Sequence, residues 1–348
     1  MDLHHTGHCA PEEDPGKRGR LKFLLVPAGL ILAVWLIWRL GPGRVWSELS
    51  GGWWPAFAGV VGAYILQQGL GTLALWLLGT RPSASGWRST SFFRLARVRY
   101  VGEVLNYSMP TGGVGGEPYK LLALSRSEGT NPAFRALAAA KFLHVAAVGP
   151  FAAAVFFSAA AKGMGGGQWH TSLIYTAAIL LVVTIALWSI VLWSFVGRLL
   201  IGGYFRIRFR VPKKLRGLRM FLHIDIAAAK EIKRAPLRTT LAYACYLGMW
   251  FAASLEWLAI ARILGPGADG LTLTGAGMFE CATIIVAAAV PVPAGMGTQE
   301  AGKAAVAAML GLGPHAGVAM SLIRRGREIL MVIAGVLLGL FEWGRRER

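Results

Sequence analysis

Apolar runs of membrane-spanning length recur along the sequence, and they limit the possible folds more than any other feature. They occupy residues 21–40, 53–79, 133–161, 171–196, 237–264 and 315–343. A helix needs about 20 apolar residues to cross the roughly 30 Å hydrocarbon core of a bilayer. Only 15% of the residues are charged, whereas soluble domains carry about 25%. The sequence therefore predicts an all-α polytopic membrane protein with about six spanning helices.

The basic residues predict how the chain is oriented. The formal net charge is +19, and the basic residues gather at 17–22, 81–99, 198–238 and 345–348. Because cytoplasmic loops are enriched in Lys and Arg, we expect both termini in the cytoplasm of a bacterial-type inner (plasma) membrane. The loop sequence LRGLRMFLHIDIAAAKEIKR predicts an interfacial helix that attracts anionic headgroups. Nucleic-acid binding is the weaker alternative, and we expect none.

This orientation requires that two segments begin and end on the same side of the membrane. Residues 81–132 begin and end on the cytoplasmic side, and the segment between residue 264 and residue 315 begins and ends outside. We therefore expect two re-entrant helical hairpins of opposite orientation, at about 88–127 and about 271–312. The alternative is that both are ordinary spans kinked by proline.

The predicted organisation has five parts. They are a disordered cytoplasmic tail (1–20), a first membrane half (21–197), a basic cytoplasmic loop (198–236), a second membrane half (237–343) and a basic C-terminal tail (344–348).

The two expected hairpin tips share a sequence pattern. In PTGGVGGEPYK and in PAGMGTQEAGK, Glu follows Pro by seven residues and Lys follows Glu by three. Broken helices in an inverted repeat are typical of transporters. The tip backbone residues that we expect to approach a ligand are Pro110, Gly112, Gly113, Gly115, Gly116, Pro293, Gly295, Gly297 and Thr298.

Each tip leads into a short helix whose N-terminus would favour an anion. Pro118 suits the first helical position after the first tip, and Thr298 is the expected N-cap after the second. A helix that begins inside the membrane presents unpaired N–H groups and a partial positive charge. A phosphate headgroup would fit there.

Ionisable residues within apolar segments supply the remaining site candidates, because such residues are costly in a membrane. The main candidates are Glu117, Lys120, Glu300, Lys303, Arg324, Arg325 and Glu328. The secondary candidates are Glu103, Asn106, Lys141, His144, Glu256 and Glu280. Helical spacing allows Glu328 to pair with either arginine, and a free guanidinium could bind phosphate through two hydrogen bonds. The alternative is that these charges only neutralise one another and hold the helices together.

Two stretches resemble a known family. GEVLNYSMPTGGVGGEPYKLLALSR and VPVPAGMGTQEAGKAAVAAMLGLGPHAGVAMSLIRRGREIL are similar to the transmembrane, flippase-like domain of the lysylphosphatidylglycerol synthase family. The second stretch looks most like the branch associated with hopanoid biosynthesis. The resemblance implies that the family's P-x-G-x-G-x-x-E pattern falls on Pro293, Gly295, Gly297 and Glu300. It places G-G-E on Gly115, Gly116 and Glu117, and the late arginine on Arg324 or Arg325.

The resemblance implies a multi-span helical bundle that moves or handles lipids between leaflets. We expect a lipid flippase or transporter for an amphiphilic lipid, either anionic or isoprenoid-like, with no catalytic residues, metal or cofactor. We expect no room in this chain for the aminoacyltransferase domain of full synthases. Two other functions stay open, an intramembrane lipid-modifying transferase and a scaffold that recruits lipid-synthesis enzymes. Proton coupling through Glu117 or Glu300 is a further hypothesis.

Overall fold

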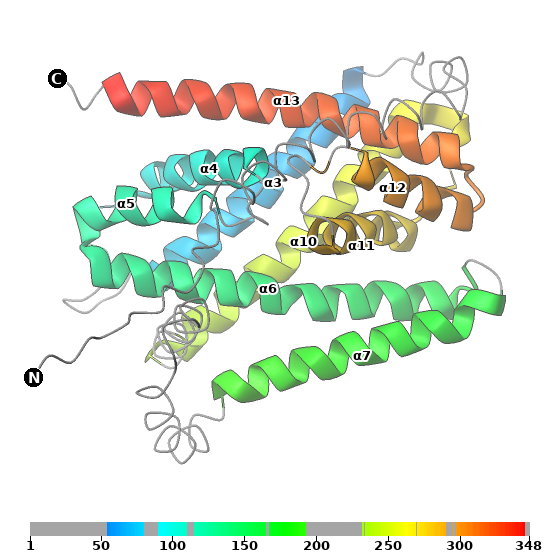
Figure 1. The fold of residues 1–348 in the computed structure, drawn as a ribbon, viewed down its shortest axis with the longest axis horizontal. Coiled ribbons are helices and arrows are strands. Elements are labelled where there is room, and N and C mark those ends of the chain that lie inside the picture. Colours follow the sequence, from blue (N-terminus) through cyan, green and yellow to red (C-terminus); the bar gives the residue numbers. More distant parts are fainter. Residues whose placement is uncertain are drawn as a thin grey trace, which may run out of the picture.

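The computed structural model describes residues 54–79, 90–109, 115–164, 167–192, 232, 234–268, 270–289, 295 and 297–344. Within these residues the regular structure consists of nine α-helices and one short 3-10 helix, and no strand occurs (Figure 1). The all-α prediction is confirmed. The predicted tail 1–20, the first predicted span 21–40, nearly all of the basic loop 198–236 and the last four residues lie outside the described part.

Three helices are long and apolar enough to cross a membrane, namely α3 (Trp54–Gly79), α6 (Thr130–Ala161) and α10 (Pro236–Leu264). Each coincides with a predicted span to within three residues at either end. The helices α7 (Gly167–Leu192) and α13 (Pro314–Gly344) occupy two more predicted spans. α13 has sufficient length, but it carries four charged residues near its middle. That charge marks α13 as a helix that faces other protein groups as well as lipid.

Four shorter helices lie in the two regions predicted as hairpins. α4 (Phe92–Ser108) and α5 (Glu117–Glu128) fall in the first region, and α11 (Leu273–Ala289) and α12 (Thr298–Met309) fall in the second. A 12-residue helix such as α5 or α12 is about 18 Å long, too short for a hydrocarbon core of about 30 Å. Their length is that expected of half-helices, and their re-entry into the membrane stays a prediction.

The helix pattern of α3–α6 recurs in α10–α13. The first set has lengths of 26, 17, 12 and 32 residues, and the second has lengths of 29, 17, 12 and 31 residues. The packing repeats as well, because α3 lies against α10, α4 contacts α13, and α11 contacts α6. The first short helix of each set thus packs on the last long helix of the other. In Figure 1, α13 lies along one side of the bundle, and α6 and α7 lie along the opposite side.

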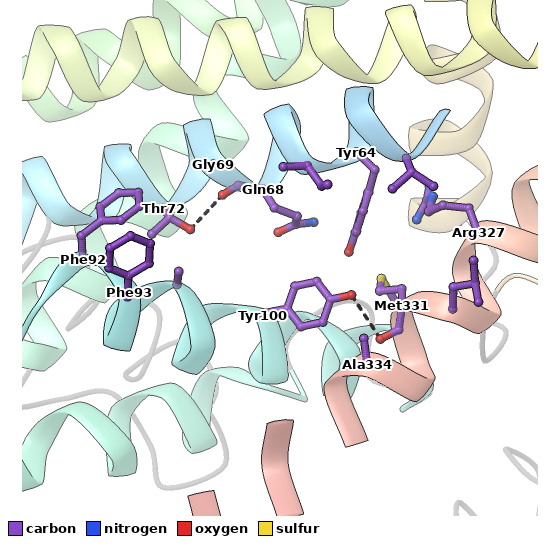
Figure 2. A pocket seen from close by; sticks show the side chains of 14 residues that line it. Tyr64, Gln68, Gly69, Thr72, Phe92, Phe93, Tyr100, Arg327, Met331 and Ala334 are labelled. Carbon is purple, nitrogen blue, oxygen red and sulfur yellow. Dashed lines mark hydrogen bonds between the residues drawn. The ribbon is translucent and has the colours of Figure 1, made fainter. Parts of the chain in front are cut away.

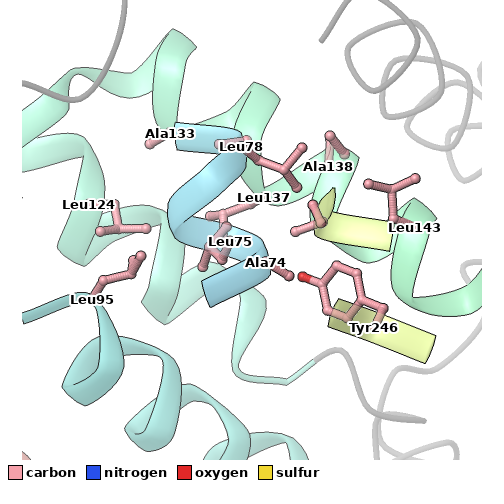
Figure 3. Close-up of a cluster of buried hydrophobic side chains, with 14 of the residues drawn as sticks. Ala74, Leu75, Leu78, Leu95, Leu124, Ala133, Leu137, Ala138, Leu143 and Tyr246 are labelled. Atoms are coloured by element: carbon pink, nitrogen blue, oxygen red, sulfur yellow. The ribbon is translucent and has the colours of Figure 1, made fainter. Parts of the chain in front are cut away.

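Each set has a main apolar core, to which the other set also contributes, α10 to the first core and Val60 of α3 to the second. The first core combines the C-terminal half of α3 with α4, α5, α6 and the beginning of α10, and Figure 3 shows Leu75, Leu124, Leu137 and Tyr246 converging there. The second core combines the C-terminal half of α10 with α11, α12 and α13 around the fully buried Trp257. Alanines dominate the buried face of α6, and such small residues allow helix backbones in membranes to approach closely.

The two short helices after the tips begin differently from the sequence prediction. α5 starts at Glu117 with Gly116 as N-cap, so Pro118 follows the first helical residue. Gly297 is the N-cap of α12 with a φ of 75°, and Thr298 is already helical. The prediction of Thr298 as N-cap is therefore wrong, because this turn needs a positive φ that glycine adopts at little cost. The Thr298 hydroxyl instead donates to the Gly295 carbonyl at 3.1 Å.

Candidate functional site

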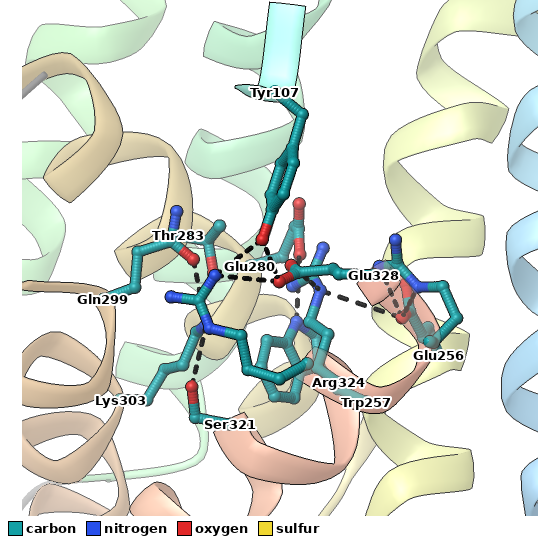
Figure 4. A network of polar contacts seen from close by, with 12 residues as sticks. Tyr107, Glu256, Trp257, Glu280, Thr283, Gln299, Lys303, Ser321, Arg324 and Glu328 are labelled. Carbon is teal, nitrogen blue, oxygen red and sulfur yellow. Dashed lines mark hydrogen bonds and ion pairs between the residues drawn. The ribbon is translucent and has the colours of Figure 1, made fainter. Parts of the chain in front are cut away.

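Ionisable side chains gather in two clusters, each beside one pair of short helices. The first polar cluster consists of Arg99, Glu103, Asn106, Glu117, Lys120, Lys141 and His144, from α4, α5 and α6. The second polar cluster consists of Glu256, Glu280, Glu300, Lys303, Arg324, Arg325, Arg327 and Glu328, from α10 to α13 (Figure 4).

Lys120 is the centre of the first polar cluster. Its ammonium group lies 2.9 Å from Glu103 Oε1 and 2.8 Å from Glu117 Oε1. Lys141 approaches the same oxygen of Glu117 at 3.9 Å. Lys120 has only 6% of its side chain exposed, whereas Lys141 has 37% exposed. Lys120 therefore holds α4 and α5 together, and Lys141 offers its charge at the accessible edge of the cluster.

Two glycines allow this arrangement. A Cβ atom on Gly116 would lie 1.8 Å from the carbonyl oxygen of Gly102, so α5 can begin against α4 only without a side chain there. A Cβ atom on Gly102 would meet the Lys120 side chain at 2.5 Å. Asn106 stabilises the same contact between α4 and α5, because its Oδ1 accepts a hydrogen bond of 2.6 Å from the Gly116 N–H. The N-terminus of α5 thus has one donor capped by a side chain from α4.

A small cavity of about 40 Å³ lies within the first polar cluster. His144 forms part of its wall and stacks on Tyr246 and Trp250, with ring centroids 5.4 and 4.9 Å away. His144 Nε2 is buried and has no hydrogen-bond partner among the described residues. A cavity of this size has room for one or a few small polar atoms. It offers a position where a ligand group or water could accept from or donate to His144.

Arg325 is the centre of the second polar cluster. Its guanidinium lies 2.8 Å from Glu300 Oε1 and 2.9 Å from Glu328 Oε2. The Tyr107 hydroxyl accepts from Arg325 at 2.7 Å and donates to Glu328 at 2.6 Å. Arg325 therefore joins α12, α13 and α4. The pairing of Arg325 with Glu328 predicted from helical spacing is present.

The two neighbouring arginines of α13 neutralise the carboxylates of α10 and α11. Arg324 donates to Glu280 at 2.8 Å and also lies 3.9 Å from Glu328, the weaker of the two predicted pairs. Arg327 contacts Glu256 at 2.7 Å. Glu256 has no exposed surface and Glu280 is almost as buried. Both secondary candidates are thus helix-joining residues in this structure, since a buried carboxylate requires a paired charge.

Lys303 is held by neutral groups. Its ammonium group donates to Gln299 at 3.1 Å and to Ser321 at 3.3 Å, and it lies 5.1 Å from the Trp257 ring centroid. Ser321 in turn donates to Glu300 at 3.3 Å. Glu300 Oε2 is buried without a hydrogen-bond partner among the described residues. This carboxylate therefore keeps an acceptor position for a ligand donor or a water molecule.

Adjacent residues of α4 connect the two clusters. Asn106 belongs to the first polar cluster, and its neighbour Tyr107 binds Arg325 and Glu328 of the second. None of the residues that line the 40 Å³ cavity belongs to the second polar cluster. In the part of the chain that the structure describes, the clusters are therefore joined by α4, and a cavity common to both tips stays a prediction.

Comparison with protein families identifies the chain. The model of the lysylphosphatidylglycerol synthase transmembrane region matches residues 21–335. The chain belongs to this family. No curated protein and no solved structure matches it. Membership in this lysylphosphatidylglycerol synthase family associates the chain with lipid handling in a membrane, and it agrees with the long apolar helices of the structure.

The ionisable residues predicted from sequence lie in these two clusters. Those of α3–α6 form the first polar cluster, and those of α10–α13 form the second. Of the predicted tip residues, Gly115, Gly116, Gly295, Gly297 and Thr298 are described. The other four, Pro110, Gly112, Gly113 and Pro293, lie outside the described part.

The sequence reading did not single out several residues of these networks. They are Tyr107, Arg99, Trp257, Gln299 and Ser321. The sequence offered one signal for Tyr107, because it directly follows the candidate Asn106.

Proposed function

We propose that this protein moves an amphiphilic lipid between the leaflets of the membrane and that the two polar clusters bind its headgroup in turn. Family membership supports a lipid as the substrate. The duplicated helix pattern supports a transporter, since repeats that meet at broken helices are a common transporter architecture. The buried charges support a polar path, because ionisable groups in a membrane interior are costly unless they serve pairing or function.

The charge balance of the clusters favours an anionic headgroup. The second polar cluster has four carboxylates and four cations, whereas the first has three cations and two carboxylates, counting His144 as neutral. The first cluster thus carries one surplus positive charge, and Lys141 presents charge at its edge. A phosphate group there would restore neutrality and receive charge-assisted hydrogen bonds. An anionic phospholipid and a polyprenyl phosphate both carry such a group, and a hopanoid-type lipid remains an alternative from the family branch.

One observation carries this proposal, the contact of Tyr107 with the Arg325–Glu328 pair. It links a helix of the first repeat to the ion pairs of the second. A ligand that draws Arg325 away from Glu300 would also disturb its hydrogen bond with Tyr107 of α4, so binding at one tip can change the other. The expected setting is a bacterial-type inner membrane with cytoplasmic termini. Anionic headgroups would bind the basic loop, and lipid-synthesis enzymes are possible neighbours.

Reconstitution into liposomes tests the proposal. Purified protein is placed in vesicles with fluorescent phosphatidylglycerol, phosphatidylcholine, or a polyprenyl phosphate, and transfer is measured by quenching of the outer leaflet. We expect wild-type protein to transfer at least one anionic lipid and Arg325→Ala to lose this activity. Arg262→Ala is the matched control, because Arg262 is exposed on α10 and belongs to neither cluster. Equal transfer by wild type and Arg325→Ala would contradict the proposed role of the site.

A further inference from the structure

A second pocket lies between α3, α4 and α13, outside the cavity of the first polar cluster (Figure 2). Its volume is about 460 Å³. Small-molecule sites usually measure about 300–1,000 Å³ and are mainly apolar with a few polar groups. The pocket follows α3 from Val61 to Thr72, a length of about 16 Å at 1.5 Å per residue. Its dimensions suit an extended hydrocarbon chain.

The two ends of this pocket differ in chemistry. Phe92 and Phe93 lie at one end, and Tyr64, Tyr100 and Arg327 lie at the other (Figure 2). The pocket is therefore apolar at one end and polar at the other. Because the phenylalanines make the end away from the charged residue apolar, an elongated ligand would place its polar group beside the tyrosines.

The polar end contains a hydroxyl group that lacks a partner. Tyr64 is 7% exposed, and its hydroxyl makes no hydrogen bond within the described residues. The Arg327 guanidinium lies 4.3 Å from the centroid of the Tyr64 ring. Tyr100 has its own partner, since its hydroxyl donates to the Met331 carbonyl at 3.3 Å. A buried hydroxyl without a partner is destabilising, and a ligand oxygen at this position could accept its hydrogen bond.

The mouth of the pocket is suited to a membrane. The lining residues Phe93, Ile65 and Leu330 are 78%, 64% and 49% exposed. On a membrane protein, apolar side chains of this kind face lipid. A lipid chain could therefore enter sideways from the bilayer.

We propose that this pocket binds the hydrocarbon chain of a membrane phospholipid, with one of the lipid's ester or phosphate oxygens accepting a hydrogen bond from Tyr64. The pocket lies beside the polar clusters that we assign to the headgroup and shares one residue, Arg327, with the second of them. Arg327 contacts Glu256 on its other side. A lipid can bind in this pocket whether or not the protein transports lipid. The test of this binding site is therefore independent of the proposed function.

Photolabelling with a phospholipid tests this site. The full chain is placed in phosphatidylcholine vesicles that contain a small fraction of phosphatidylcholine with a diazirine in its chain. After irradiation, adducts are mapped by mass spectrometry. We expect adducts on the inner wall, at Gln68, Tyr100 and Met331, and general labelling of the exposed α7 residues Ile179 and Val182.

A substitution that fills the pocket provides the decisive comparison. A Cβ atom on Gly69, which lines the pocket, would meet nothing within 4 Å, so Gly69→Phe fills the space without a backbone clash. Gly62→Phe is the matched control, because Gly62 is on the same helix, has equal room and does not line the pocket. We expect Gly69→Phe to reduce inner-wall adducts roughly tenfold, equal to about 1.4 kcal/mol, with α7 labelling unchanged.

A second variant tests the polar end. Tyr64→Phe keeps the ring and removes the hydroxyl, and we expect inner-wall adducts to fall roughly fivefold. Unchanged inner-wall labelling in Gly69→Phe would overturn the proposal. So would the absence of inner-wall adducts in wild-type protein whose α7 is labelled, which would mean that residues 21–40 or a second copy of the chain occupies the pocket.

Discussion

The hydroxyl of Tyr107 offers the most direct way to measure the link between the two repeats. Tyr107→Phe keeps the ring and removes one oxygen that donates to Glu328 at 2.6 Å and accepts from Arg325 at 2.7 Å. Both bonds involve a charged partner, and such bonds contribute about 1.5–3 kcal/mol each in soluble proteins. Hydrogen bonds in membrane proteins contribute less, about 0.6 kcal/mol on average and about 1.7 at most. We therefore expect the loss of both bonds to destabilise the protein by about 2 kcal/mol.

The assay is reversible unfolding in mixed detergent micelles, which gives the free energy of unfolding. Tyr100→Phe is the matched control on the same helix, because its single hydrogen bond is long, at 3.3 Å, and accepted by a neutral carbonyl. We expect this control to lose less than about 1 kcal/mol. A double-mutant cycle of Tyr107→Phe with Glu328→Gln should give a coupling energy of about 1 kcal/mol. A coupling energy near zero would refute the contact between the repeats.

Three further predictions concern the close contact of Gly116 with α4, the carboxylates that follow the two tips, and the surplus positive charge of the first polar cluster. Gly116→Ala should destabilise the fold by about 1–3 kcal/mol, because the new Cβ atom would lie 1.8 Å from a carbonyl oxygen of α4. Gly326→Ala, whose Cβ atom would meet nothing within 4 Å, should be neutral or stabilising in the same unfolding assay. If transport is proton-coupled, Glu117→Gln combined with Glu300→Gln should abolish the response of lipid transfer to an imposed pH gradient, and an unaltered response would exclude this coupling. Lys141→Gln should weaken the binding of phosphatidylglycerol to the detergent-solubilised protein roughly fivefold, about 1 kcal/mol for the loss of one charged contact.

The sequence was sufficient to predict the all-α membrane fold class and the positions of the long helices, because the membrane leaves few choices. Apolar runs of fixed length predicted α3, α6 and α10 closely. The spacing of Pro, Glu and Lys indicated that the tips are related, and the matching lengths of α3–α6 and α10–α13 support a repeat. These signals are local, since they depend on residue type and short spacing alone.

The side-chain networks could not be predicted in the same way, because they join residues far apart in the chain. Helical spacing predicted the pairing of Arg325 with Glu328, but nothing local indicates that Arg327 contacts Glu256 or that Arg324 contacts Glu280. The contacts of Tyr107 depend on how α4 packs against α13. The N-cap of α12 was misassigned because threonine is a frequent N-cap, whereas this turn requires the positive φ of Gly297.

Transfer of labelled phosphatidylglycerol between leaflets tests the central claim most directly. The comparison uses liposomes that contain wild-type protein, Arg325→Ala or Arg262→Ala, each shown to be folded by the unfolding assay. We predict rapid transfer by wild type and Arg262→Ala, and transfer at the rate of protein-free vesicles by Arg325→Ala. Equal transfer by all three proteins, or no transfer of any tested lipid by folded wild-type protein, would contradict the account.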